Sequence, residues 1–163
     1  MNRFLSGVMG QCFLKVLTGS VLALSVFGMT QAAPVGPMKN IQAERMMQTA
    51  ESMAKDRQVQ ICIAIVDAAG RLMAFKRMDD AIPGCVDAAI QKARAAALYQ
   101  ETTQSFMQRA SNAETAVMQL PDMLPVTGGV PVSFNNEIIG AVGISGTTAS
   151  IEAAIAKAAG SAR

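Results

Sequence analysis

The chain has 163 residues, of which 14 are lysine or arginine, 12 are aspartate or glutamate and none is histidine. Without an imidazole, it cannot build a Ser-His-Asp or Cys-His catalytic site, a zinc site based on histidine, or a heme site with a histidine ligand. The near balance of charge gives no basic surface of the kind that binds nucleic acid.

The N-terminal segment, residues 1–32, has the pattern of a cleaved signal peptide. Arg3 and Lys15 are its only charges, residues 16–29 are an apolar stretch, and Thr30-Gln31-Ala32 is a small-x-small triplet of the kind that signal peptidase cuts after. The stretch is shorter than the roughly 20 residues that span a bilayer. We expect cleavage after Ala32, which leaves residues 33–163 as one periplasmic or secreted domain without a membrane segment. An uncleaved membrane anchor and a buried first helix are the alternatives.

The first half of this domain predicts a helix followed by a hairpin. Residues 40–56 carry a single apolar helical stripe, and Asn40 is expected to cap the helix. Residues 59–66 alternate as in a β-strand, Gly70 closes a turn over residues 67–70, and residues 71–78 return as a second strand.

The second half predicts helices around another hairpin. Residues 85–99 form an alanine-rich helix, residues 101–119 are helical in pieces, and residues 121–129 are a loop by composition. Asn135-Asn136 joins two strands over residues 130–134 and 137–145. A last helix starts near Ser150 and is expected to stop at Gly160 and to bury Ile151, Ala154, Ile155, Ala158 and Ala159. Two hairpins separated by helices predict an α+β domain with an antiparallel sheet and exclude a doubly wound dinucleotide fold.

Several short motifs then occur in a recognisable order. They are Ile65-Val66-Asp67-x-x-Gly70-x-Leu72, Phe75-x-Arg77-Met78-Asp79, Lys92-Ala93, Gly128-Gly129-Val130-Pro131-Val132 and Ile139-Gly140-Ala141-Val142-Gly143-Ile144-Ser145-Gly146. In this order they resemble the GlcG/HbpS heme-binding-like family, to which the PduO C-terminal domain also belongs. The resemblance implies a profilin-like three-layer α/β/α domain with a five-stranded antiparallel sheet and helices on both faces. It also implies a homo-oligomer, and heme or a related tetrapyrrole as the ligand. The chain departs from the family at Ser150-Ile151-Glu152, where members commonly carry a Gln-Asp-Glu-like sequence.

Candidate ligand-binding residues lie at the ends of the predicted strands and on one helix. Gly128-Gly129 offers close backbone approach and N–H donors, and the competing interpretation is a plain turn. Ser145-Gly146 precedes a helix N-terminus that can hold an anion or simply be capped. The strand end at Arg77, Met78 and Asp79 is a binding loop or a solvated end. Lys92 matches the family pattern and can pair with a propionate, whereas a solvated helix face is its alternative. We expect the glycine doublet and the loop after Met78 to meet in one groove.

Cys62 and Cys85 are the only cysteines after the predicted leader, and export makes a disulfide between them possible. A small buried strand residue is the alternative for Cys62, and a thiolate ligand or redox sensor is the alternative for Cys85. Without histidine, an axial heme ligand has to be Met78, Cys85, Tyr99 or a weak oxygen donor such as Thr127. The sequence does not choose among these four, and it identifies no metal site.

The sequence favours an exported protein that binds heme or a related tetrapyrrole in an apolar cleft through anion contacts, without a histidine ligand and without a catalytic residue. One alternative is an enzyme or small-acid-binding protein that uses Asp79 or Glu152 in the same cleft as the acid-base group. The other is a redox or scaffold accessory protein that acts through its oligomer surface and the cysteine pair.

Overall fold

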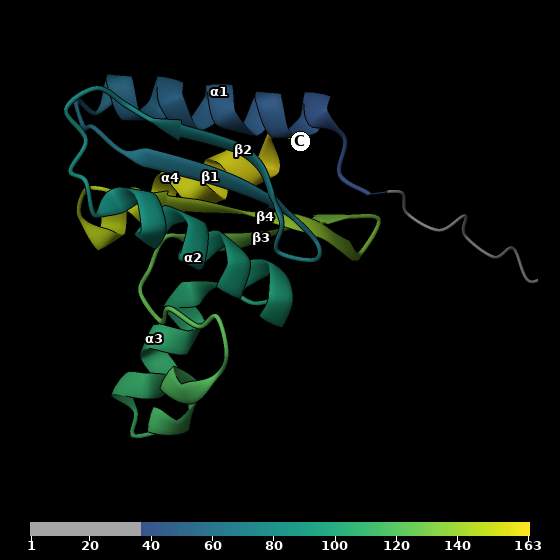
Figure 1. Ribbon diagram of the computed structural model, residues 1–163, viewed down its shortest axis with the longest axis vertical. Coiled ribbons are helices and arrows are strands. Elements are labelled where there is room, and N and C mark those ends of the chain that lie inside the picture. Colours follow the sequence, from purple (N-terminus) through teal and green to yellow (C-terminus); the bar gives the residue numbers. More distant parts are fainter. Residues whose placement is uncertain (1–36) are drawn as a thin grey trace, which may run out of the picture. The chain divides into compact units, whose positions relative to one another are not determined.

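Two β-hairpins join in one antiparallel sheet (Figure 1). The computed structural model describes residues 37–163, so the predicted leader, residues 1–32, and its cleavage site lie outside the described part. Strand β1 (Cys62–Asp67) pairs with β2 (Leu72–Arg77), and β3 (Gly129–Phe134) pairs with β4 (Glu137–Ser145). The pairing of β1 with β4 joins the two hairpins and gives the strand order β2-β1-β4-β3.

The expected antiparallel sheet is confirmed, but the expected number of strands is wrong. The sheet of residues 37–163 has four strands rather than five. The fifth strand came from the family resemblance, whereas the alternating pattern of the residues contains only the two hairpins. The stretch between the hairpins forms helices because its apolar residues do not alternate.

Local sequence explains both hairpin turns. Asn135 and Asn136 have φ values of 49° and 64°, the left-handed conformation that a two-residue hairpin turn requires at both positions. Gly70 has φ 73°, and the Asp67 carboxylate accepts hydrogen bonds from the backbone N–H groups of Ala69 and Arg71, both at 2.9 Å. Asp67 and Gly70 therefore shape the first turn.

Helices cover both faces of the sheet. Helices α1 (Asn40–Asp56) and α4 (Ala149–Ser161) pack on one face, and α2 (Cys85–Tyr99) packs on the other. Helix α3 (Thr103–Ser111) and the 3-10 helix η1 (Thr115–Gln119) extend away from the sheet beyond α2 (Figure 1). The sheet is thus the middle of three layers. No helix in the range 37–163 combines the length and apolar character needed to cross a bilayer.

The two faces are packed with different side chains. The face under α1 and α4 is filled by large residues, including Met46, Ile63 and Ile144, all fully buried. The face under α2 is lined by alanines and glycines, so the helix backbone lies close to the strands. A Cβ atom built on Gly143 would lie 2.1 Å from the carbonyl oxygen of Ala89 in α2. Only glycine fits at that position.

A disulfide fastens α2 to the sheet. Cys62 at the start of β1 is bonded to Cys85, the first residue of α2. The two residues are 0% and 1% exposed, so the bond is enclosed within the alanine-lined layer. Cys85 therefore provides neither a thiolate ligand nor an accessible redox sensor in this state.

The predictions for two helices need correction. Asn40 is the first helical residue of α1, while Lys39 is the N-cap, and the Lys39 N–H donates to Gln42 Oε1 at 2.8 Å. Helix α4 continues past the predicted stop at Gly160 to Ser161. Its buried stripe is also shifted from the predicted one, because Ala154 is exposed, Ile151 and Ala158 are only partly buried, and the buried residues are Glu152, Ile155, Ala156, Ala159 and Gly160.

Candidate functional site

The predicted site residues are distributed over three cavities. The glycine doublet lines a cavity of about 430 Å³, Lys92 lines one of about 400 Å³, and the loop after β2 lines one of about 330 Å³. The first and the last share no lining residue. The prediction that the glycine doublet and the loop after Met78 meet in one groove is therefore wrong. The reason is the strand order, which places β2 and β3 at opposite edges of the sheet, about 14 Å apart at the usual strand spacing.

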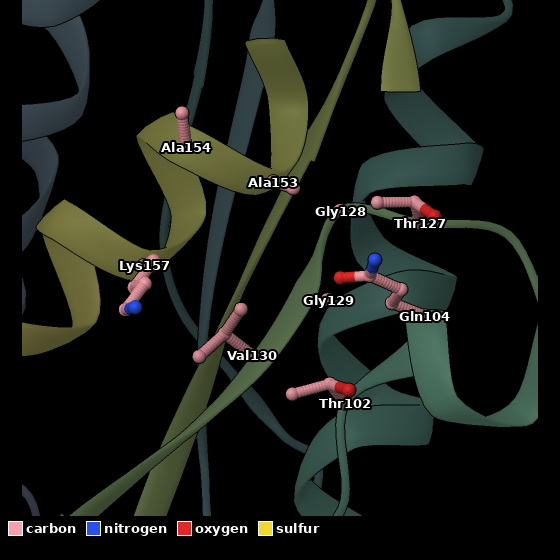
Figure 2. Close-up of a pocket in the computed structure, with 9 residues that line it drawn as sticks. All are labelled: Thr102, Gln104, Thr127, Gly128, Gly129, Val130, Ala153, Ala154 and Lys157. Carbon is pink, nitrogen blue, oxygen red and sulfur yellow. The ribbon is translucent and has the colours of Figure 1, made fainter. Parts of the chain in front are cut away.

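The glycine-doublet cavity lies between β3, α4 and the start of α3 (Figure 2). Helix α4 contributes one wall, and the opposite wall comes from the chain before α3 and the loop before β3. Lys157 is the one charged residue in the lining, so the cavity has an apolar body with a single cation on its rim. The complete lining is Thr102, Gln104, Thr127, Gly128, Gly129, Val130, Ala153, Ala154 and Lys157.

Gly128 and Gly129 are required because neighbouring backbone leaves no room for a side chain, whether or not a ligand is bound. Gly128 has φ 125°, and a Cβ atom there would lie 2.4 Å from the carbonyl oxygen of Ile144. A Cβ atom on Gly129 would lie 2.3 Å from the carbonyl oxygen of Lys92. The N–H of Gly129 already donates to Thr103 Oγ1 at 2.9 Å. The doublet thus brings β3 close to β4 and α2, and the Gly129 N–H is not free for a ligand.

Lys92 is buried rather than solvated. Its side chain is 3% exposed, and its Nζ lies 2.7 Å from Oε2 of Glu152, whose side chain is 6% exposed. The ammonium also donates to the Ile144 carbonyl at 3.2 Å and to Ser145 Oγ at 3.4 Å. The alternative of a solvated helix face is wrong for Lys92. A role in pairing a ligand anion stays a prediction, since the cation already has a carboxylate partner.

Glu152 links the start of α4 to the end of β4. Its Oε1 accepts hydrogen bonds from the N–H groups of Gly146 at 2.9 Å and Thr147 at 3.1 Å. These two N–H groups lie just before the N-terminus of α4, the helix end that the sequence offered as an anion site. The chain's own carboxylate thus binds the segment that leads into α4, and Ser145-Gly146 and Lys92 are parts of one internal network.

Arg77, Met78 and Asp79 belong to a polar cavity at the other edge of the sheet. Arg77 Nε and Nη2 donate to the Ala81 carbonyl at 3.0 and 2.6 Å, and Asp79 is exposed. Met78 is 7% exposed and packs into the core under α1 and α4. Glu51 of α1 lines the same cavity, and hydrogen bonds from Lys55 and Lys76 hold its pKa below the ordinary value of 4.5.

One of the four candidate axial ligands lines the glycine-doublet cavity. Thr127 is 3% exposed, and its hydroxyl lies 3.6 Å from Met107 Sδ. Met78 packs in the core, Cys85 is in the disulfide, and the Tyr99 hydroxyl donates to the Pro121 carbonyl at 2.7 Å. The lining fits the apolar body and a carboxylate of a tetrapyrrole, but it holds no histidine, cysteine, methionine or tyrosine for iron. Among residues 37–163 no cluster of three or more His, Cys, Asp or Glu side chains could hold a metal ion.

Sequence reasoning named Glu152 only as a possible acid-base group and missed its ion pair with Lys92. The predicted stripe of α4 was based on apolar residues alone, so it left out a buried acid. Glu152 nevertheless lies at helical spacing from the buried residues Ile155, Ala156 and Ala159. Gln104, Ala153 and Lys157 were also missed. Their residue types are common on solvated helices, and the packing of α4 and of the start of α3 beside β3 brings them together.

Comparison with known proteins assigns the fold to a family. A family model described as haem degrading protein HbpS-like matches residues 38–161. Protein GlcG of Escherichia coli (strain K12) is 36% identical over 103 residues, which are 63% of this chain and 77% of that protein. The crystal structure of Klebsiella pneumoniae protein ORFY has a TM-score of 0.72 and 26% identity over 82% of this chain and 95% of that one. The PduOC:heme complex has a TM-score of 0.73 and 23% identity over 78% and 96% of the two chains, a likeness of fold. Because the family model matches most of the chain, the resemblance predicted from the sequence motifs is confirmed, and the chain belongs to the HbpS-like family.

Proposed function

We propose that this chain is an exported protein that binds heme or a related tetrapyrrole in the glycine-doublet cavity, without a histidine ligand. The observation that carries the proposal is the lining of that cavity, which combines small apolar residues with one cation. Its volume of about 430 Å³ falls in the usual range for small-molecule sites, about 300 to 1,000 Å³. Membership of the HbpS-like family and the heme complex of the related PduOC fold support the choice of ligand class.

The residues of the cavity have separate roles in this proposal. Val130 and Ala153 contact the apolar macrocycle, while Lys157 pairs with a propionate at the rim. Thr127 and Gln104 offer neutral oxygen atoms, which are weak ligands for iron. A bound heme would supply a redox-active iron. Because the protein side provides no strong iron ligand, most of the binding free energy comes from the porphyrin ring and its carboxylates.

No particular contact favours either alternative function, the enzyme or small-acid-binding protein on the one hand and the redox or scaffold accessory protein on the other. Asp79 is exposed, and Glu152 is held by the Lys92 ammonium and two backbone N–H groups, so neither is a free acid-base group in a cleft. The cysteine pair is enclosed, which leaves the redox accessory role without an accessible thiol.

The proposal retains the homo-oligomer, since β2 and β3 each have one strand edge unpaired within residues 37–163. Light scattering on the purified protein measures the number of copies.

Spectral titration of the purified protein tests the proposal. We expect hemin to give a saturable Soret shift, and metal-free protoporphyrin IX to compete with it at a similar concentration. Lys157→Ala should weaken hemin binding by about threefold to tenfold through loss of one exposed ion pair at the rim. Lys55→Ala, on α1 and outside this cavity, is the matched control. Absence of a saturable shift, or failure of protoporphyrin to compete, would contradict the proposal.

A further inference from the structure

The cavity that Lys92 lines is separate from the glycine-doublet cavity. It lies between the start of α2, the loop before β3 and the start of α4, and it has a volume of about 400 Å³. The two cavities share no lining residue. The Lys92–Glu152 pair stands between them, since a Cβ atom on Gly128 would lie 3.2 Å from both Glu152 Oε2 and Lys92 Cδ. A ligand can therefore occupy the second cavity without entering the first.

The floor of this second cavity is polar and electrically balanced. The ammonium of Lys92 and the carboxylate of Glu152 lie 2.7 Å apart and cancel each other's charge. Ser145 is 8% exposed, and its Oγ accepts from Lys92. The hydroxyl hydrogen of Ser145 has no acceptor among the hydrogen bonds of residues 37–163, so it is free to donate to a ligand in the cavity.

The mouth of the second cavity is apolar. Ile82 is 60% exposed and Val126 is 43% exposed, and both line this cavity together with Leu124 and Ala88. Two of the large hydrophobic residues that the described chain leaves in solvent thus surround the opening above a polar floor. Small-molecule sites commonly combine an apolar lining with a few polar groups that fix orientation.

We propose that this second cavity binds a small uncharged carbonyl or alcohol compound. The ligand oxygen accepts a hydrogen bond from the Ser145 hydroxyl, and its carbon skeleton covers Ile82, Leu124 and Val126. The preference for an uncharged ligand follows from the balanced charge of the floor. The Lys92 ammonium and the Glu152 carboxylate already pair with each other, so neither is free to offset the cost of removing a charged ligand group from water.

Three probes with the same aromatic body and different head groups test this proposal: acetophenone, 1-phenylethanol and benzoate. Each is titrated into the purified ¹⁵N-labelled protein, and the amide signals of Gly146 and Thr147 are followed by NMR. We expect acetophenone and 1-phenylethanol to give saturable shifts at these amides, with benzoate at least about fivefold weaker because no unpaired cation offsets the desolvation of its carboxylate. Benzoate binding as tightly as acetophenone, or shifts centred on Val130 and Lys157, would overturn the proposal.

Two variants locate the contacts. Ser145→Ala should weaken acetophenone about threefold or more through the lost hydrogen bond, whereas Ser150→Ala, an exposed serine outside the cavity lining, should leave it unchanged. Ile82→Ser should also weaken it, and since Ile82 is exposed, this variant tests the apolar contact without disturbing the core. Unchanged acetophenone affinity in both Ser145→Ala and Ile82→Ser would also overturn the proposal. Hemin titration of the same variants separates this result from the function of the first cavity.

Discussion

The two faces of the sheet are packed in opposite ways. Under α1 and α4, side chains as large as methionine and isoleucine fill the space between helix and strand. Under α2, alanines meet glycines, and the helix backbone lies almost against the backbone of β4. The first face is stabilised by contacts of large side chains. On the second face, the absence of side-chain atoms lets the helix backbone approach the strand backbone. A substitution that adds one methyl group should therefore have different effects on the two faces.

The largest expected effect is that of Gly143→Ala, on the α2 face. The new Cβ atom would lie 2.1 Å from the Ala89 carbonyl and 2.6 Å from the Ala93 nitrogen, so α2 has to move away from the sheet. Overpacking typically costs about 1 to 3 kcal/mol and occasionally more, and backbone atoms have less freedom to move aside than the end of a side chain. We expect the free energy of unfolding, measured by urea denaturation, to fall by about 3 kcal/mol or more, at or beyond the upper end of that range.

Gly160→Ala is the matched change on the other face. A Cβ atom there would meet side-chain atoms of Val132, Val130 and Val142 at 3.6 to 3.7 Å, which is ordinary contact. Because alanine is the better helix former, we expect this variant to be more stable than the native chain by up to about 1 kcal/mol. Equal unfolding midpoints for Gly143→Ala and Gly160→Ala would show that the two faces are packed alike.

Removal of the disulfide should have the next largest effect. The bond joins residues 23 apart and holds the first residue of α2 on β1. Replacing both cysteines by alanine should lower the free energy of unfolding by about 3 kcal/mol, the usual value for a loop of this length. Calorimetry of the double variant beside the disulfide-bonded native protein measures the loss, and the reduced native protein is the control for the change of side chains. A loss below about 1 kcal/mol would mean that the alanine and glycine contacts hold α2 without the bond.

The local elements of the fold could be predicted from the sequence. The turn residues Gly70, Asn135 and Asn136 and the alternation around them locate both hairpins, and the apolar stripe locates α1. These features follow from contacts between residues close in the chain. The family motifs added the layered arrangement, but they also led to the expectation of a fifth strand.

The candidate site was harder to predict because it depends on contacts between distant residues. The order β2-β1-β4-β3 follows from the pairing of β1 with β4, which no local pattern reveals, and it separates Arg77 from Gly129. The ion pair of Lys92 with Glu152 joins residues 60 apart. In the sequence, a lysine or a glutamate on a helix is typical of a solvated face. Only their mutual burial in the structure shows that these two residues form the wall between two cavities.

The smallest expected effect is a dependence of stability on pH. It comes from Glu51, at the outer edge of the sheet face that α1 covers. Glu51 of α1 accepts from Lys55 and from Lys76 of β2, and these contacts lower its pKa. A carboxylate whose pKa is lower in the folded state stabilises the fold above its unfolded pKa, and this contribution is lost as the pH falls through the folded pKa. Glu51→Gln should therefore lower the free energy of unfolding by about 0.5 kcal/mol at neutral pH, and by nothing measurable once the native carboxylate is protonated. Glu44→Gln, on an exposed position of the same helix, is the control for loss of one charge. A difference between Glu51→Gln and the native chain that persists at the acid end would mean that Glu51 acts through packing rather than through its charge.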